Sequence, residues 1–143
     1  MAKSPTKSAR INTQLLKLTH LSETQKRITN VWSEKHTDII YETDQYYYVT
    51  NIVSLMRIDK SMYQLEYIDT KYIEEDIFSD LVEGVLMCAN YGSVRVNPTL
   101  LPDLLKAHDL FGSYPVITVS SFEDNQYLVL TDNGLVSILA GCV

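Results

Sequence analysis

Three histidines and two cysteines are among the residues of this 143-residue chain that could bind a metal or act in catalysis. His20, His36 and His108 are far apart in the sequence and belong to no HExxH or CxxC pattern, so no zinc site is predicted. Cys88 and a histidine could form a nucleophile and its base, but Cys88 lies in the apolar run LMCA, which is typical of a buried strand. Glycine-rich loops that hold phosphates are missing too. We therefore expect a protein that is not an enzyme and uses no cofactor.

Basic side chains are concentrated at the start of the chain. The first 35 residues hold seven basic and two acidic residues, a net charge of +5, whereas the remaining residues hold five basic and sixteen acidic ones, a net charge of −11. A basic front on an acidic body can bind a polyanion, and it can equally be a solubilising tail with ordinary helix surfaces behind it. The charge distribution leaves both interpretations open.

Length and composition bound the class of protein. Hydrophobic residues make up 45% of the chain and charged residues 21%, which is typical of a folded globular domain. Every apolar run is shorter than the roughly 18 residues that cross a membrane, and no apolar segment follows the basic N-terminus as in a signal peptide. Cys88 and Cys142 both lie in apolar surroundings, which favours reduced thiols. We expect a cytoplasmic protein with a flexible basic arm over residues 1–10 and a single α+β domain over residues 11–143.

Two short helices are predicted in the N-terminal part of this domain. Apolar residues recur at helical spacing over residues 11–18, and the sequence SETQ at residues 22–25 has the form of a capping box before a second apolar stripe that ends near Trp32. Lys26 and Arg27 lie away from that stripe, where they face either solvent or a ligand.

An antiparallel sheet is predicted to follow. Residues 38–42 and 45–49 form one expected hairpin, and residues 53–58 and 62–68 form another. The tyrosines of these strands could stack on nucleic-acid bases, but without interleaved lysine or arginine they are more typical of half-buried strand residues. Residues 69–83 are acidic; they could hold a divalent cation, but they lack a calcium-loop pattern, which favours a solvated face and no metal site.

The last third of the chain has the clearest pattern. A short strand over residues 94–96 leads to a helix in which Leu100, Leu101, Leu104 and Leu105 form one apolar face, and Gly112 ends it. Three strands then follow as a β-meander, at residues 116–119, 127–130 and 135–139, separated by polar turns.

This closing strand, helix and meander resembles part of a domain of the DNA polymerase sliding clamps. The sequence VRVNPTLLPDLLKA at residues 94–107 is similar to their strand-to-helix junction, with Asn97 or Thr99 as the cap and Pro102 in the first turn, and the resemblance covers roughly residues 84–140. In that family each domain is a βαβββ unit repeated twice, and its helices line the DNA channel. The resemblance implies sequence-independent contacts with DNA phosphates. The residues it assigns to DNA binding are Lys17, Lys26, Arg27, Lys106 and His108.

The family's rings contain six domains, whereas this chain has room for one. A ring would therefore need six copies of this chain or a second gene product; the fold could also serve without encircling DNA. We expect a homo-oligomer that supports DNA replication or a related DNA transaction on double-stranded DNA, together with replication proteins and without a membrane. Two other classes of function fit the same sequence. One is a virion structural or assembly protein of the neck or tail type, because an arm and acidic strands also suit subunit packing. The other is a small inhibitor that binds a host enzyme through its acidic face.

Overall fold

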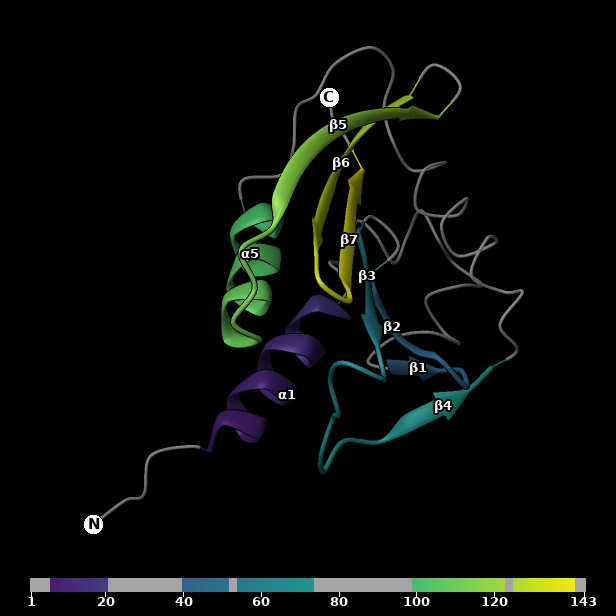
Figure 1. Ribbon diagram of the computed structural model, residues 1–143, viewed down its shortest axis with the longest axis vertical. Coiled ribbons are helices and arrows are strands. Elements are labelled where there is room, and N and C mark those ends of the chain that lie inside the picture. Colours follow the sequence, from purple (N-terminus) through teal and green to yellow (C-terminus); the bar gives the residue numbers. More distant parts are fainter. Residues whose placement is uncertain (1–5, 21–39, 52–53, 74–98, 123–124, 141–143) are drawn as a thin grey trace.

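The computed structural model describes residues 6–20, 40–51, 54–73, 99–122 and 125–140 (Figure 1). These residues form two helices and a seven-stranded mixed sheet with the strand order β4-β1-β2-β3-β7-β6-β5, so the predicted α+β class is confirmed. In chain order the elements are α1 (Lys7–Leu18), β1 (Ile40–Glu42), β2 (Tyr46–Thr50), β3 (Ser54–Asp59), β4 (Thr70–Tyr72), α5 (Leu100–Leu110), β5 (Val116–Phe122), β6 (Asn125–Asp132) and β7 (Leu135–Ala140).

Among the described elements, a helix followed by a three-stranded meander occurs twice, with β4 between the two occurrences. In the first half α1 precedes the meander β1-β2-β3, and in the second half α5 precedes the meander β5-β6-β7. The third strand of each half, β3 and β7, pair antiparallel at the centre of the sheet, with Met56 opposite Ser137. Both helices contact each other and pack on the same side of the sheet (Figure 1). The two halves therefore share one continuous sheet and one helix layer.

Alternate strand residues and one face of each helix form the core between these layers. Leu15 on α1 and Leu104 on α5 are buried, and so are Met56 and Leu139 on the paired central strands. Tyr41 and Tyr48 are buried on the other face of the sheet, at 3% and 2% exposure, so β1 and β2 carry buried residues on both faces. These two tyrosines are strand residues, as predicted, but they are buried almost completely and not half-buried as expected.

The N-terminal prediction needs correction. One N-terminal helix is described, where two were predicted, and it begins at Lys7 inside the segment predicted to be a flexible arm. The Thr6 hydroxyl accepts a hydrogen bond from the backbone N–H of Ala9 at 3.1 Å, so a side-chain cap allows the helix to start one turn earlier than its apolar stripe indicates. Residues 22–32, which carry the second predicted helix, lie outside the described chain.

The helix of the second half follows the sequence closely. It spans Leu100–Leu110, and Gly112 adopts the left-handed φ of +74° just after it, as predicted for a helix stop. Thr99 is the N-cap residue, but its side chain makes no capping hydrogen bond. Asn97 lies outside the described residues, as do the predicted strand at residues 94–96 and the acidic stretch beyond residue 73.

The meander of the second half is confirmed in all three strands, and the first hairpin and β3 lie close to their predicted positions. The fourth predicted strand, residues 62–68, is wrong. Tyr63, Leu65 and Ile68 pack against the core without joining the sheet, and the Tyr63 ring meets the Phe111 ring edge-on at 5.0 Å. A short strand, β4, pairs parallel with β1, so the sheet is mixed and not purely antiparallel.

Candidate nucleic-acid interface

Helix α1 is the most basic element that the structure describes. It carries Lys7, Arg10 and Lys17, has no acidic residue, and exposes all three cations. Because an α-helix turns about 100° per residue, these positions lie within about 80° of one another around the axis. Lys7 and Arg10 form no ion pair with any described residue. The helix thus presents a narrow basic stripe beside the face that it buries.

Lys17 lies where the two helices meet. Its ammonium group is 3.3 Å from a carboxylate oxygen of Asp103 on α5, and its side chain is 57% exposed. Nearby, the buried Gln14 side chain donates a hydrogen bond of 2.8 Å to the backbone carbonyl of Asp103. The sequence therefore identified a surface cation, but the structure shows that an acidic neighbour partly neutralises it.

Lys106 is exposed on α5, as the resemblance implies. Asp103 and Asp109 lie three residues before and after it, on the same side of the helix, so with a neutral His108 the net charge of α5 is −1. Lys26 and Arg27, the other two predicted contacts, fall in a part of the chain that the structure does not describe. Positive charge in the described helix layer is accordingly concentrated on α1, mainly at two residues that the sequence reasoning did not select, Lys7 and Arg10. Their spacing of three residues could have indicated that they lie on the same side of a helix.

The expected surface position of His108 is wrong. The residue has no exposed surface, its Nδ1 lies 3.0 Å from Ser113 Oγ, and its Nε2 lies 2.8 Å from Ser137 Oγ on β7. Positions 104, 107 and 108 follow the i, i+3, i+4 spacing of one buried stripe, so the imidazole points towards the sheet with Leu104 and Ala107. His108 is therefore removed from the set of possible DNA contacts.

A polar chain surrounds this imidazole. The Asp132 carboxylate accepts hydrogen bonds from the backbone N–H of Tyr114 and from the Ser113 hydroxyl, and both bonds lower its pKa. One proton arrangement satisfies every group: the Ser137 hydroxyl donates to Nε2, Nδ1–H donates to Ser113, and the Ser113 hydroxyl donates to Asp132. Burial lowers the pKa of His108 to about 4, against a smaller opposing effect of the Asp132 charge. The imidazole is therefore neutral at pH 7.

Ser137 and His108 are close enough to resemble a nucleophile and its base. Both side chains are completely buried, however, so no substrate can reach the hydroxyl in this arrangement. Their hydrogen bond instead connects α5 to β7, the strand through which the second half pairs with the first. The geometry supports a structural role because a buried polar group needs a partner wherever a helix packs on a sheet.

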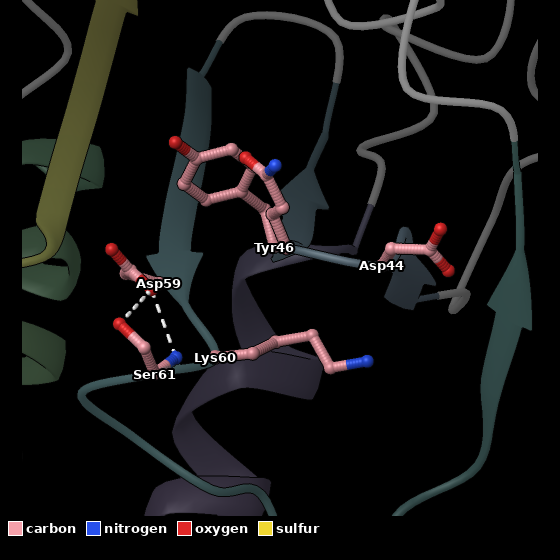
Figure 2. Close-up of a pocket in the computed structure, with 6 residues that line it drawn as sticks. Asp44, Tyr46, Asp59, Lys60 and Ser61 are labelled. Carbon is pink, nitrogen blue, oxygen red and sulfur yellow. Dashed lines mark hydrogen bonds between the residues drawn. The ribbon is translucent and has the colours of Figure 1, made fainter.

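A shallow polar pocket lies where the β1–β2 turn meets the end of β3. Its volume is about 300 Å³, and Figure 2 shows the Asp59 and Ser61 side chains on one side and the Lys60 side chain extending on the other. Ser61 donates to the Asp59 carboxylate through its backbone N–H at 2.8 Å and its hydroxyl at 2.7 Å, which lowers the pKa of Asp59. The lining residues are Asp44, Gln45, Tyr46, Asp59, Lys60 and Ser61.

The charged groups of this pocket already have partners within the chain. The Lys60 ammonium group lies 3.2 Å from a Glu42 carboxylate oxygen and donates to the Thr43 carbonyl at 3.1 Å. The Asp44 carboxylate accepts a hydrogen bond of 3.2 Å from the Tyr72 hydroxyl. The pocket therefore presents side chains engaged in local structure. Among the described residues no group of three or more His, Cys, Asp or Glu side chains could hold a metal ion.

No described helix is both long enough and apolar enough to span a membrane. Neither a protein-family model, nor a curated protein, nor a solved structure matches this chain. The interpretation of function therefore depends on the residues and their arrangement.

Proposed function

We propose that this protein is a non-catalytic, clamp-like protein that associates with double-stranded DNA, without reading its sequence, and supports DNA replication or a related DNA transaction as an oligomer. The observation that carries the proposal is the repeated order of helix and three-stranded meander, with both helices on one side of a continuous sheet. A repeated unit of this kind is what the sequence resemblance implies for one clamp domain.

The charge on α1 supports a contact with phosphates. Lys7 and Arg10 are exposed, have no ion-pair partner in the described chain, and lie on a helix without acidic residues. Such cations displace the counterions that surround DNA, and the gain does not depend on the base sequence. The remainder of the chain beyond residue 35 is acidic, and the whole protein has a net charge of −6, which favours approach of DNA through the basic N-terminal part that includes this stripe.

Salt-dependent DNA binding tests this proposal. The full chain is titrated with a short duplex at several salt concentrations, beside Lys7→Glu, Arg10→Glu and a control, Lys71→Glu, which makes the same charge change on exposed β4. We expect the parent to bind with a salt dependence, and each α1 variant to reduce the slope of log K against log salt by about 1. Combined Lys26→Glu and Arg27→Glu substitutions extend the test to the other predicted contacts. Lack of salt-dependent binding by the parent would contradict the proposal.

An assembly or structural role is the second candidate, and one observation favours it. Strand β5 forms an edge of the sheet and exposes Val116, Ile117 and Val119, which is typical of a surface that contacts another subunit. A protein that oligomerises but shows no salt-dependent retention on DNA would fit this role and not the clamp-like one.

A further inference from the structure

The two edges of the sheet differ in length and in charge. Strand β5 has seven residues and no charged side chain, whereas β4, at the opposite edge, has three residues that include Lys71 (Figure 1). Natural edge strands are usually kept from pairing by shortness, charge, proline or a bulge. Strand β4 has the first two of these protections. In β5 the seven residues pair with β6 in continuous register, so it has none of them.

Strand β5 also exposes apolar side chains on both of its faces. Ile117 and Val119 lie on the side of the helices, at 47% and 55% exposure, and Val116 lies on the other side at 62%. The cross-strand partners of the first two, Leu130 and Leu128, are buried core residues. The core of the sheet therefore continues to this edge and remains open to solvent there, next to backbone groups that no described strand pairs.

We propose that β5 pairs antiparallel with β5 of a second copy of this chain, about a two-fold axis at Val119, the midpoint of the strand. A two-fold axis places identical surface patches against each other, so any charge at the interface would oppose its own copy. An uncharged strand avoids this repulsion in a chain whose net charge is −6. Pairing of β5 with β4 of another copy would instead match seven residues with three and leave more than half of β5 exposed.

The geometry of this dimer follows from the axis. Val119 lies opposite Val119, Ile117 lies opposite Ser121 of the other copy, and two seven-stranded sheets join into one of fourteen strands. An axis perpendicular to the sheet keeps both helix layers on one side, as the pairing of β3 with β7 does within the chain. The inference assigns a surface and a symmetry to the oligomer and does not require contact with DNA.

Mass in solution tests the dimer. We expect the full chain, by sedimentation or light scattering across a concentration series, to have twice the monomer mass of 16.3 kDa. Val119→Lys places two ammonium groups together at the axis and should weaken dimerisation by about 100-fold or more, because like charges at a shared interface cost several kcal/mol. Leu16→Lys makes the same kind of change at an exposed residue of α1 and should leave the mass unchanged. A monomeric parent at every concentration would overturn the proposal.

Disulfide capture gives a second readout that does not depend on disrupting the fold. Residues on a two-fold axis between antiparallel strands bring their Cα atoms to about 5 Å, which suits a disulfide bond. Val119→Cys should therefore form a covalent dimer under mild oxidation, whereas Tyr72→Cys on β4 and the parent, with its two native cysteines, should not. Two results would show a different interface and overturn the two-fold arrangement. One is a covalent dimer formed by Tyr72→Cys but not by Val119→Cys. The other is an assembly that Tyr72→Lys dissociates and Val119→Lys does not.

Discussion

The two halves of this protein use the same order of elements in different ways. In the first half α1 contributes Leu15 and Leu18 to the core and keeps three cations on its surface. In the second half α5 contributes Leu104 and Ala107, and it also buries a histidine against β7. A polar side chain is tolerated in the second half because Ser113 and Ser137 satisfy both ring nitrogens. A shared architecture thus fixes where helices pack, and single residues decide whether a face is a surface or a core.

The sheet shows the same contrast at its two edges. The first half has strands of three, five and six residues, with β4 alongside β1. The second half has strands of seven, eight and six residues, and β5 is left as a long edge. The first half therefore offers charge on its helix, and the second half offers apolar surface on its outer strand. Each difference leads to a separate experiment above, so the failure of one leaves the other standing.

The largest expected effect compares matched leucines in the two helices. Leu15 and Leu104 have 0% and 1% exposure, and each packs in the shared core. Replacing either by alanine should lower the free energy of unfolding by about 3 kcal/mol, because the substitution removes buried methyl groups and leaves a cavity. Urea denaturation followed by circular dichroism measures both variants. Similar losses with a single transition would mean that the halves unfold together, and two separate transitions would contradict the shared core.

The second largest expected effect is a pH dependence of stability that comes from His108 in the second half. The pKa of His108 is about 4 in the folded chain and near 6.5 when unfolded, so between these values the unfolded state binds a proton that the native state does not. The lowered pKa of His108 therefore contributes up to about 3 kcal/mol to the free energy of unfolding. This stabilisation is fully present above pH 6.5 and is lost as the pH falls towards 4. The lowered pKa values of Asp59 and Asp132 act in a different window, because their stabilisation is lost only as the pH falls below 3.8.

Urea unfolding at pH 7, 6, 5 and 4.5 measures this effect. His108→Gln should reduce the slope of stability against pH in that range, although it lowers stability at pH 7 by removing a paired buried ring. His20→Gln, at an exposed residue just after α1, is the control and should keep the slope of the parent. An unchanged slope in His108→Gln would contradict the neutral, buried imidazole.

The smallest expected effect is at the contact between the two helices. Lys17→Ala removes the ion pair with Asp103, but the lysine side chain is 57% exposed, so water and salt already screen the attraction. We expect a loss of about 0.5 kcal/mol or less in the free energy of unfolding, and no difference from the parent in 1 M salt. A loss comparable to that of Leu15→Ala would show that charge, and not apolar packing, joins the halves.

Local pattern predicted most of the second half. Apolar spacing placed α5 and the three strands of the meander, and Gly112 correctly marked the end of the helix. The same reasoning failed at residues 62–68, where alternating apolar residues pack against the core from an irregular segment. Asn12 of α1 donates a hydrogen bond of 2.6 Å to the Glu66 carbonyl there, so the backbone has a partner outside any sheet. A period of two indicates burial on one side and does not by itself require a strand partner.

The candidate site was predicted less well than the fold. Lys17 and Lys106 are exposed as expected, but His108 is buried, and the basic stripe depends on Lys7 and Arg10 in a segment predicted to be a flexible arm. Residue type identifies which side chains can carry charge. Whether a charged side chain faces solvent depends on where the helix starts and on which stripe of the helix faces the sheet. Contacts between residues distant in the sequence decide which stripe faces the sheet.

The sequence by itself determined which segments become helices and strands in the second half, because spacing within a segment depends on neighbouring residues. Only the tertiary structure decided that β3 joins β7, that β4 runs parallel to β1, and that β5 is left at an edge. It also placed His108 between two serines that are 5 and 29 residues away. These outcomes require distant segments to share one core and to satisfy one another's hydrogen bonds, and no local pattern carries that information.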